Sequence, residues 1–296
     1  MVGGKMKLKS VDKFTTVVIY LLAGIAAIMA LYPIYFVVIA SISSPDAVEN
    51  GLVYLWPKYI TFEGYEKVFQ DARIWMGYRN TIFYTLAGTA ISLLVTLPAA
   101  FVLSRKDFKA RNTIMMMFVF TMFFGGGLIP TYLLIKDLNL YNTIWVMILP
   151  FSLNVYNLII ARSFFESSIP ESLGEAAKID GCSDIRFFIS IILPLSKAII
   201  AVILLYYAVA QWNEYFKALI YLRDENLQTL QIVLRSILIQ NQSFDGSAAE
   251  GFAETQNLFD LIKYAVIVVS TIPIIMVYPF VQKYFTKGVM IGAVKG

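Results

Sequence analysis

Long apolar runs dominate the pattern of hydrophobic and polar positions along this chain. A helix needs about 20 mainly apolar residues to cross the hydrocarbon core of a bilayer. Six stretches satisfy this requirement, namely residues 17–43, 80–103, 113–135, 143–164, 191–216 and 258–285. The last four contain polar or helix-breaking residues, so their boundaries are predicted only to within several positions. The pattern predicts an all-α polytopic membrane protein with six transmembrane helices.

Composition agrees with a membrane protein and excludes several kinds of chemistry. The chain is 58% hydrophobic and 15% charged, whereas a soluble domain is about 25% charged. Its single Cys cannot form an intramolecular disulfide, and the absence of His removes His-dependent zinc sites and catalytic triads. We therefore expect no metal site. The first apolar run, 17–43, has no charge and is longer than the ~7–15 residues of a signal-peptide core, so it is predicted to remain as the first span.

The placement of Lys and Arg predicts the orientation of the chain. Basic residues are more frequent on the cytoplasmic side of membrane proteins. With the N-terminus inside, 15 of the 24 basic residues fall on the cytoplasmic side. The prediction is a cytoplasmic N-terminus at 1–16, a transmembrane domain at 17–286 and a cytoplasmic tail at 287–296. The long outer loops are then 44–79 and 221–257.

The charged segment 165–194, between the fourth and fifth spans, has the pattern of two short helices. Pro170 suits the first turn of a helix, and Glu171 complements its dipole. Gly181 is a natural helix stop because it tolerates a positive φ, and Ser183 can cap a second helix. Two interpretations remain open at this point: a helix pair lying at the membrane interface, or a short helix that docks into a groove on another protein.

Residue strings across the chain resemble one family. The string Glu175-Ala-Ala-Lys-Ile-Asp-Gly181, followed by Ile191-Ile-Leu-Pro194, is similar to the EAA loop of bacterial ABC importer permeases. Further similarities to MalG-type carbohydrate permeases are Asn80-Thr81, Ala99–Arg105, Trp212-Asn213 and the tail from Gln282 to Gly296. The segment from Phe124 to Tyr132 resembles the LplC and YtcP branch. The resemblance implies the fold of a type I ABC importer transmembrane domain.

The resemblance also implies which residues couple the chain to an ATPase. These are Glu175, Ala176, Ala177, Asp180, Gly181, Ile191, Leu193 and Pro194. The sequence departs from the family pattern at two positions. Cys182 stands where Ala is usual, an exchange of small residues that should leave docking intact. Ala198 stands where Pro often occurs, so the fifth span is predicted to begin straighter than in the family.

The energy for transport is expected to come from other subunits. No Gly-x-x-x-x-Gly-Lys-Ser/Thr phosphate loop occurs in the chain. We therefore expect this chain to bind no cofactor and not to be an enzyme. The resemblance implies two ATP-binding subunits that use ATP and Mg²⁺, a second MalF-like permease and an extracytoplasmic solute-binding lipoprotein. It also implies a location in the bacterial cytoplasmic membrane, and nothing indicates binding to nucleic acid.

Three further groups of residues are candidates for contact with the transported molecule or its binding protein. Gly125, Gly126 and Gly127 interrupt the third span, either as a break that lines a cavity or as a close contact between helices. Polar or aromatic residues late in the fifth span form either a sugar-facing gate or an interface anchor, and they are Gln211, Trp212, Asn213 and Glu214. The polar tip of the second outer loop either contacts the binding protein or is solvated, and its candidates are Gln240, Asn241, Gln242 and Asp245.

These patterns predict a permease subunit of an ATP-driven ABC importer for oligosaccharides or related carbohydrates. It would form half of the translocation pathway and couple to the ATPase through the EAA loop. Two alternatives remain: an ion-coupled secondary transporter, and an ABC permease for a small solute that is not a sugar.

Overall fold

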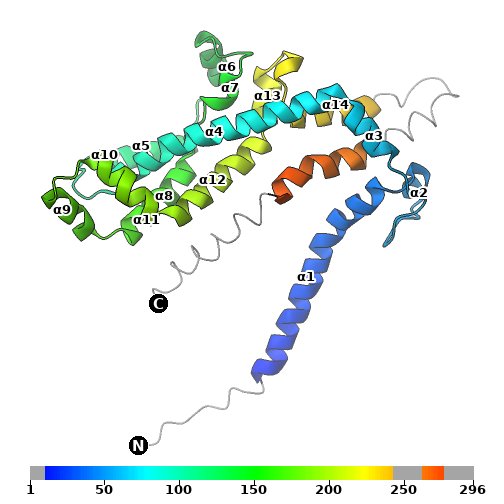
Figure 1. Ribbon diagram of the computed structural model, residues 1–296, viewed down its shortest axis with the longest axis horizontal. Coiled ribbons are helices and arrows are strands. Elements are labelled where there is room, and N and C mark those ends of the chain that lie inside the picture. The colour runs from blue at the N-terminus through cyan, green and yellow to red at the C-terminus, as the bar shows by residue number, and fades with distance from the viewer. Residues whose placement is uncertain (1–10, 243–261, 277–296) are drawn as a thin grey trace, which may run out of the picture. The chain divides into compact units, whose positions relative to one another are not determined.

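The computed structural model describes residues 11–242 and 262–276 of the chain. Within these ranges every regular element is a helix (Figure 1). The chain divides into two compact units. The first falls within Met1–Gln70 and Ile237–Thr271, and the second within Asp71–Ser236 and Ile272–Gly296.

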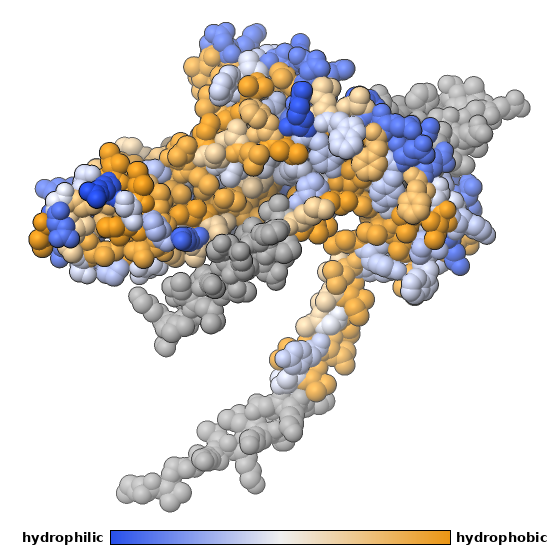
Figure 2. All heavy atoms as spheres, in the orientation of Figure 1, coloured by the Kyte–Doolittle hydropathy of each residue, from blue (hydrophilic) through white to orange (hydrophobic). Residues whose placement is uncertain are grey.

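The first unit contains the first predicted span. Helix α1, Val11–Ser41, has 31 residues and covers most of the predicted run 17–43. It is one of two described helices that are long and apolar enough to cross a membrane, and Figure 2 shows mainly hydrophobic residues along it. The short helices α2, Pro45–Glu49, and α3, Glu63–Gln70, follow it. The α2 helix begins at Ser44, whose hydroxyl accepts a hydrogen bond from the Ala47 N–H.

The second unit is built on α4, Ala72–Ser104, the other long apolar helix. It packs against α8, Val155–Ser168, and α12, Lys197–Trp212, as Figure 1 shows. Their shared core includes the fully buried Ala100, Leu158, Ala161, Ile192 and Ile203. Small residues on α4 and α8 let these helices approach closely. The predicted span 80–103 is therefore a helix, and it begins about two turns earlier than expected.

The third predicted span, 113–135, is broken at the three glycines that were predicted to interrupt it. Helices α5, Arg111–Phe123, and α6, Leu128–Asp137, meet at an angle of 113°. The backbone between them passes through Gly127, which has a φ of +84°. Because L side chains rarely adopt this conformation, a glycine at this position makes the sharp turn possible.

The fourth predicted span, 143–164, is also interrupted. It contains the four-residue helix α7, Trp145–Ile148, and most of α8, and residues 149–154 between them are not helical. Pro150 and the positive φ of Phe151, +65°, accompany the break. The Asn154 side chain then caps α8 by accepting the Asn157 N–H at 3.1 Å. An unbroken apolar run thus does not form an unbroken helix here.

The charged segment 165–194 forms short helices, as predicted. They are α9, Glu171–Ile179, and α10, Asp184–Phe187, followed by a π-helical turn, Phe188–Ile192, and by α11, Leu193–Leu195. The wide π turn ends just before Leu193-Pro194, and Pro194, which has no N–H to donate, lies in the first turn of α11, where a proline is tolerated.

The fifth span begins with a sharp bend, contrary to the expectation drawn from Ala198. The helical segment Asp184–Leu195 meets α12 at 85°. The bend falls at Ser196, two residues before Ala198, where ψ is 19° and the helix ends. A proline at position 198 is therefore not needed to bend this segment.

The remaining elements are α13, Phe216–Tyr221, a 3₁₀ turn, Glu225–Leu227, and α14, Leu230–Gln242. An apolar helix, Ile262–Met276, covers part of the sixth predicted span. In the described part of the chain, two helices are long enough to cross a membrane, or four spans if each bent pair counts as one. The six-helix topology and the predicted segment boundaries therefore remain predictions.

Candidate functional site

The α9 helix ends in a turn that requires Gly181. The Gly181 N–H donates to the Lys178 carbonyl at 3.1 Å, and the Cys182 N–H donates to the Ala177 carbonyl at 2.9 Å. This pair of bonds is a Schellman motif, and it needs a residue with positive φ after the helix. Gly181 supplies a φ of +70°. The prediction that Gly181 stops this helix is confirmed.

One face of α9 packs on the apolar core of the second unit, to which this helix belongs. Ala177 is buried, and Leu173 packs on the same apolar core. The aromatic ring of Phe187 lies within 3.9 Å of the position that a Cβ on Gly174 would occupy. The ring of Phe101 on α4 lies 6.1 Å from that of Phe187, so the loop is anchored to the end of a long helix.

The opposite face of α9 is exposed. Of the candidate coupling residues, the exposed ones are Glu175, Ala176, Asp180 and Gly181. Glu175 forms no ion pair with any residue in the described ranges. Ile191 and Leu193 instead pack partly buried on the core, while Pro194 is exposed. The EAA string thus has four exposed residues, and the Ile-x-Leu pair holds the loop against the core.

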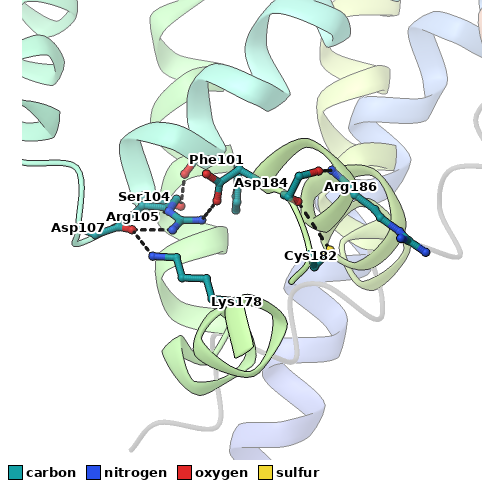
Figure 3. Close-up of polar contacts among 9 residues, drawn as sticks. Phe101, Ser104, Arg105, Asp107, Lys178, Cys182, Asp184 and Arg186 are labelled. Carbon is teal, nitrogen blue, oxygen red and sulfur yellow. Dashed lines mark hydrogen bonds and ion pairs between the residues drawn. The ribbon is translucent and has the colours of Figure 1, made fainter. Parts of the chain in front are cut away.

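Ion pairs tie this loop to the chain segment after α4, as Figure 3 shows. Arg105 contacts Asp107 at 2.5 Å and Asp184 at 3.0 Å. Lys178 on α9 contacts Asp107 at 3.1 Å. We call these four residues (Arg105, Asp107, Lys178 and Asp184) the inner clamp. A further pair, Lys106 with Glu171 at 2.6 Å, lies beside the clamp.

Hydrogen bonding fixes the charge state of the inner clamp. The Arg105 guanidinium, helped by Lys178, holds the pKa of the Asp107 carboxyl well below its ordinary value. Asp107 in turn raises the pKa of Arg105. Because the Asp107 side chain is 51% exposed, each pair alone stabilises the fold by no more than about 1 kcal/mol. The main effect of the inner clamp is thus to fix the orientation of α9, and its contribution to the stability of the fold is small.

A small pocket opens beside the clamp. It has a volume of about 680 Å³ and lies between the loop after α4 and helix α9. Its wall includes Phe101, Arg105, Asp107, Phe165, Glu171 and Glu175. The clamp residues were not predicted from the sequence. The only signal was the run Arg105-Lys-Asp107, which says nothing about a contact with Asp184, 79 positions away.

A much larger cavity, of about 1520 Å³, lies in the second unit. Gly125, Gly126 and Gly127 line it. No atom in the described structure lies within 4 Å of a Cβ built on Gly125 or Gly127. The close helix contact considered for these glycines is therefore absent among the described residues, and the break instead borders an open space. The wall is mainly apolar and aromatic, and its aromatic members are Phe151, Tyr156, Tyr206, Tyr207, Trp212, Phe216 and Tyr221.

Two of the candidate residues late in the fifth span have structural contacts as well as a place in the cavity wall. The Gln211 side-chain amide donates to the Met147 carbonyl at 2.6 Å, which joins α12 to α7. Its side chain also lies 3.1 Å from the Cβ position of Gly88 on α4. Trp212 is buried, and its indole N–H has no hydrogen-bond partner among the described residues.

The two residues that follow end α12. The Asn213 amide donates to the Val209 carbonyl of its own helix at 2.9 Å, and Asn213 does not line the cavity. Glu214 does line the cavity and pairs with Lys217 at 3.0 Å. The structure thus brings Gln211, Trp212 and Glu214 to the same cavity as the three glycines.

Asn80 and Thr81 hold the chain that precedes α14. The Asn80 amide donates to the carbonyls of Asn226 and Gln228 at 2.7 and 2.9 Å. The Thr81 hydroxyl accepts the Leu230 N–H at 2.8 Å. This pair therefore organises the 3₁₀ turn and the start of α14.

The candidates in the second outer loop lie at the edge of the described structure. Gln240, Asn241 and Gln242 belong to the last turn of α14, but their side chains are outside the described residues, as is Asp245. Their contact with a binding protein stays a prediction.

The sequence and the fold were compared with known proteins. Residues 72–291 match the family described as binding-protein-dependent transport system inner membrane component. The chain is 41% identical over 270 residues to the polygalacturonan/rhamnogalacturonan transport system permease protein YtcP of Bacillus subtilis, covering 91% of this chain and 94% of that protein. It is 40% identical over 280 residues to Protein LplC of the same organism, covering 94% and 93%.

A solved structure has a similar fold. It is a bacterial ABC transporter involved in the import of the acidic polysaccharide alginate. The TM-score is 0.84 at 38% identity, and the match covers 94% of this chain and 98% of that one. The resemblance to ABC importer permeases noted in the sequence is confirmed, including the likeness to YtcP and LplC. The chain belongs to the family of binding-protein-dependent transport system inner membrane components, which are transport permeases of ABC importers rather than enzymes.

Proposed function

We propose that this chain is a permease subunit of an ATP-driven importer of oligosaccharides and forms one half of its translocation pathway. The names of two similar proteins support a carbohydrate cargo, since one is a polygalacturonan/rhamnogalacturonan transport permease and the other belongs to an importer of alginate. Family membership argues against a self-sufficient, ion-coupled carrier, because the family works with a binding protein.

The exposed face of α9 is the observation that carries this proposal. Glu175, Ala176, Asp180 and Gly181 face outward from a helix that the inner clamp holds at the end of α4. A short helix that is attached to the end of a long, packed helix can transmit a displacement caused by a partner to the rest of the unit. Small side chains at such a surface permit close approach of a groove. We assign ATPase docking to this face.

The cavity in the second unit is the proposed path of the sugar. The exposed aromatic rings of Tyr156 and Tyr206 offer flat apolar surfaces on which sugar rings can stack. The side chain of Glu214, which lines the cavity, can bind sugar hydroxyls. The broken backbone at Gly125–Gly127 fits a water-filled path, because irregular backbone at membrane depth needs water or protein partners.

The proposed assembly contains other chains. Two ATP-binding subunits would use ATP and Mg²⁺, a second permease would complete the pathway, and an extracytoplasmic lipoprotein would deliver the sugar. This chain would lie in the bacterial cytoplasmic membrane with both termini cytoplasmic and the EAA loop facing the ATPases.

Reconstitution into liposomes tests the proposed function. We expect the chain alone to take up no oligosaccharide under a proton or sodium gradient. With its ATPases, second permease and binding protein, ATP should drive uptake of at least one member of a panel of labelled oligogalacturonides, alginate oligosaccharides and neutral oligosaccharides. Gradient-driven uptake by the chain alone would contradict the proposal. Uptake of amino acids with no uptake of any sugar would reject the carbohydrate cargo.

A further inference from the structure

The segment after α2 returns along the span helix α1 instead of leading away from it. Val53 packs in one buried cluster with Ile39 of α1 and Ala47 of α2. The Tyr32 hydroxyl donates to the Tyr54 carbonyl at 3.3 Å, and the Tyr35 hydroxyl donates to the Leu55 carbonyl. We call residues 52–60 the returning segment. Figure 1 shows this segment beside the end of α1.

The contacts with α1 place the returning segment at a definite level of the span. The apolar stretch of α1, Thr15–Ser41, has 27 residues, which corresponds to about 40 Å of helix. A hydrocarbon core of about 30 Å leaves roughly 5 Å at each end. Tyr35 and Tyr32 lie about 9 and 14 Å before Ser41 along the axis. The backbone at Tyr54 and Leu55 therefore reaches roughly 4 to 9 Å inside the hydrocarbon boundary.

The side chains of the returning segment suit that level. Tyr54, Leu55 and Trp56 are 65%, 61% and 74% exposed, although all three are large and apolar or aromatic. Three such neighbours would be costly in water, whereas Tyr and Trp are enriched where lipid tails meet headgroups. The exposed surface is thus of the kind that lipid stabilises.

The polar groups of the segment are arranged as a lipid environment requires. Irregular backbone in hydrocarbon needs a partner for its carbonyls, and the Tyr32 and Tyr35 hydroxyls supply two of them. The exposed Lys58 lies at the end of α1, since its N–H donates to the Ser43 hydroxyl at 3.2 Å and its carbonyl accepts the Ser44 N–H at 3.2 Å. That level places its ammonium among the lipid phosphates, where long cationic side chains extend.

We propose that the returning segment is embedded in the membrane leaflet around the C-terminal half of α1, with Leu55 and Trp56 in contact with lipid chains. In contrast to the sequence-based prediction of an outer loop over 44–79, these residues would not face water. The partner is lipid, and Lys58 marks the headgroup level. The proposal depends on α1 crossing the membrane and not on the nature of the cargo.

Spin-label accessibility in the assembled transporter tests this proposal. A nitroxide is attached at Trp56→Cys in a Cys182→Ala background, with cysteines of the partner chains replaced, and the transporter is reconstituted into phosphatidylglycerol–phosphatidylethanolamine vesicles. Collisions with dissolved oxygen, which concentrates in lipid, are compared with collisions with a water-soluble nickel chelate. We expect the ratio of oxygen to nickel collisions at position 56 to be severalfold higher than at Glu63→Cys, an exposed position on α3 of the same unit.

Two results would overturn the proposal. A ratio at position 56 equal to that at Glu63→Cys would place the segment in water. Low collision rates with both reagents would place it against another protein surface. A second label at Leu55→Cys guards against a local disturbance at Trp56 and should give the same high ratio. Sugar transport is measured in a separate assay, so neither result of the spin-label experiment decides the proposed function.

Discussion

Gly181 determines how α9 ends, because the turn after the helix has a φ of +70°. An L side chain in this region costs about 1–2 kcal/mol, and Asn tolerates it better than other residues do. We expect Gly181→Val to loosen the end of α9 and to weaken coupling of ATP hydrolysis to uptake, and Gly181→Asn to do so much less. The measurement is uptake per ATP hydrolysed in proteoliposomes. Equal coupling in Gly181→Val and the unmodified chain would contradict the assigned geometry.

The lowered pKa of the Asp107 carboxyl leads to a prediction about pH. Its pKa is held below the ordinary value of 3.8 by Arg105 and Lys178. The ionised form is therefore favoured in the folded chain, and the stabilisation it gives is complete above about pH 4 and lost as the pH falls through the lowered pKa. We expect a carbon-13 titration of Asp107 to give a midpoint below 3.8, and Lys178→Met to raise that midpoint. A midpoint at or above the ordinary value would show that the clamp does not form.

At the scale of elements, the start of α4 packs closely on the start of α14. A Cβ on Gly77 would lie 2.9 Å from the Leu230 Cα, a backbone atom that cannot move aside by rotation. We expect Gly77→Ala to destabilise the purified protein by about 1–3 kcal/mol, seen as a lower melting temperature in detergent. Gly24→Ala on α1 is the matched control, since its Cβ would meet no atom within 4 Å. Equal melting temperatures for the two variants would contradict this packing.

An element could be predicted from the sequence only where a local pattern of residues determines it. The long helices α1 and α4 were predicted because hydropathy over 20 residues reports a span directly. Hydropathy does not report whether a helix is continuous, so the break after Ile148 was missed. The break after Phe123 was predicted, because three consecutive glycines, 125–127, mark it. The bend at Ser196 was likewise missed, because the absence of a proline at position 198 carries no information about a helix end two residues earlier.

The candidate site likewise contains one feature that a local sequence pattern predicts and others that it does not. The stop at Gly181 follows from the conformational freedom of one residue, and it was predicted. The salt bridge between Arg105 and Asp184 joins residues 79 positions apart, and no local pattern contains that information. The hydrogen bond from the Gln211 side chain to the Met147 carbonyl was missed for the same reason.

At the scale of the whole molecule, the two proposed tasks lie at separate places in the second unit. The cavity beside Gly125–Gly127 would pass the sugar, and the exposed face of α9 would receive the push from an ATPase. The inner clamp and the core of α4, α8 and α12 connect them. Transport should then depend on α9 even though α9 does not line the larger cavity.

The most direct test of this central claim is the coupling of ATP hydrolysis to uptake in the reconstituted transporter carrying Glu175→Arg. Glu175 is exposed and forms no ion pair in the described structure, so the change should leave the fold of the chain intact. Lys109→Glu is the control, a charge reversal at an exposed residue of the loop after α4. We predict that Glu175→Arg inserts normally but loses most uptake per ATP hydrolysed, and that Lys109→Glu retains it. Unchanged coupling in Glu175→Arg would contradict the assignment of α9 as the ATPase contact.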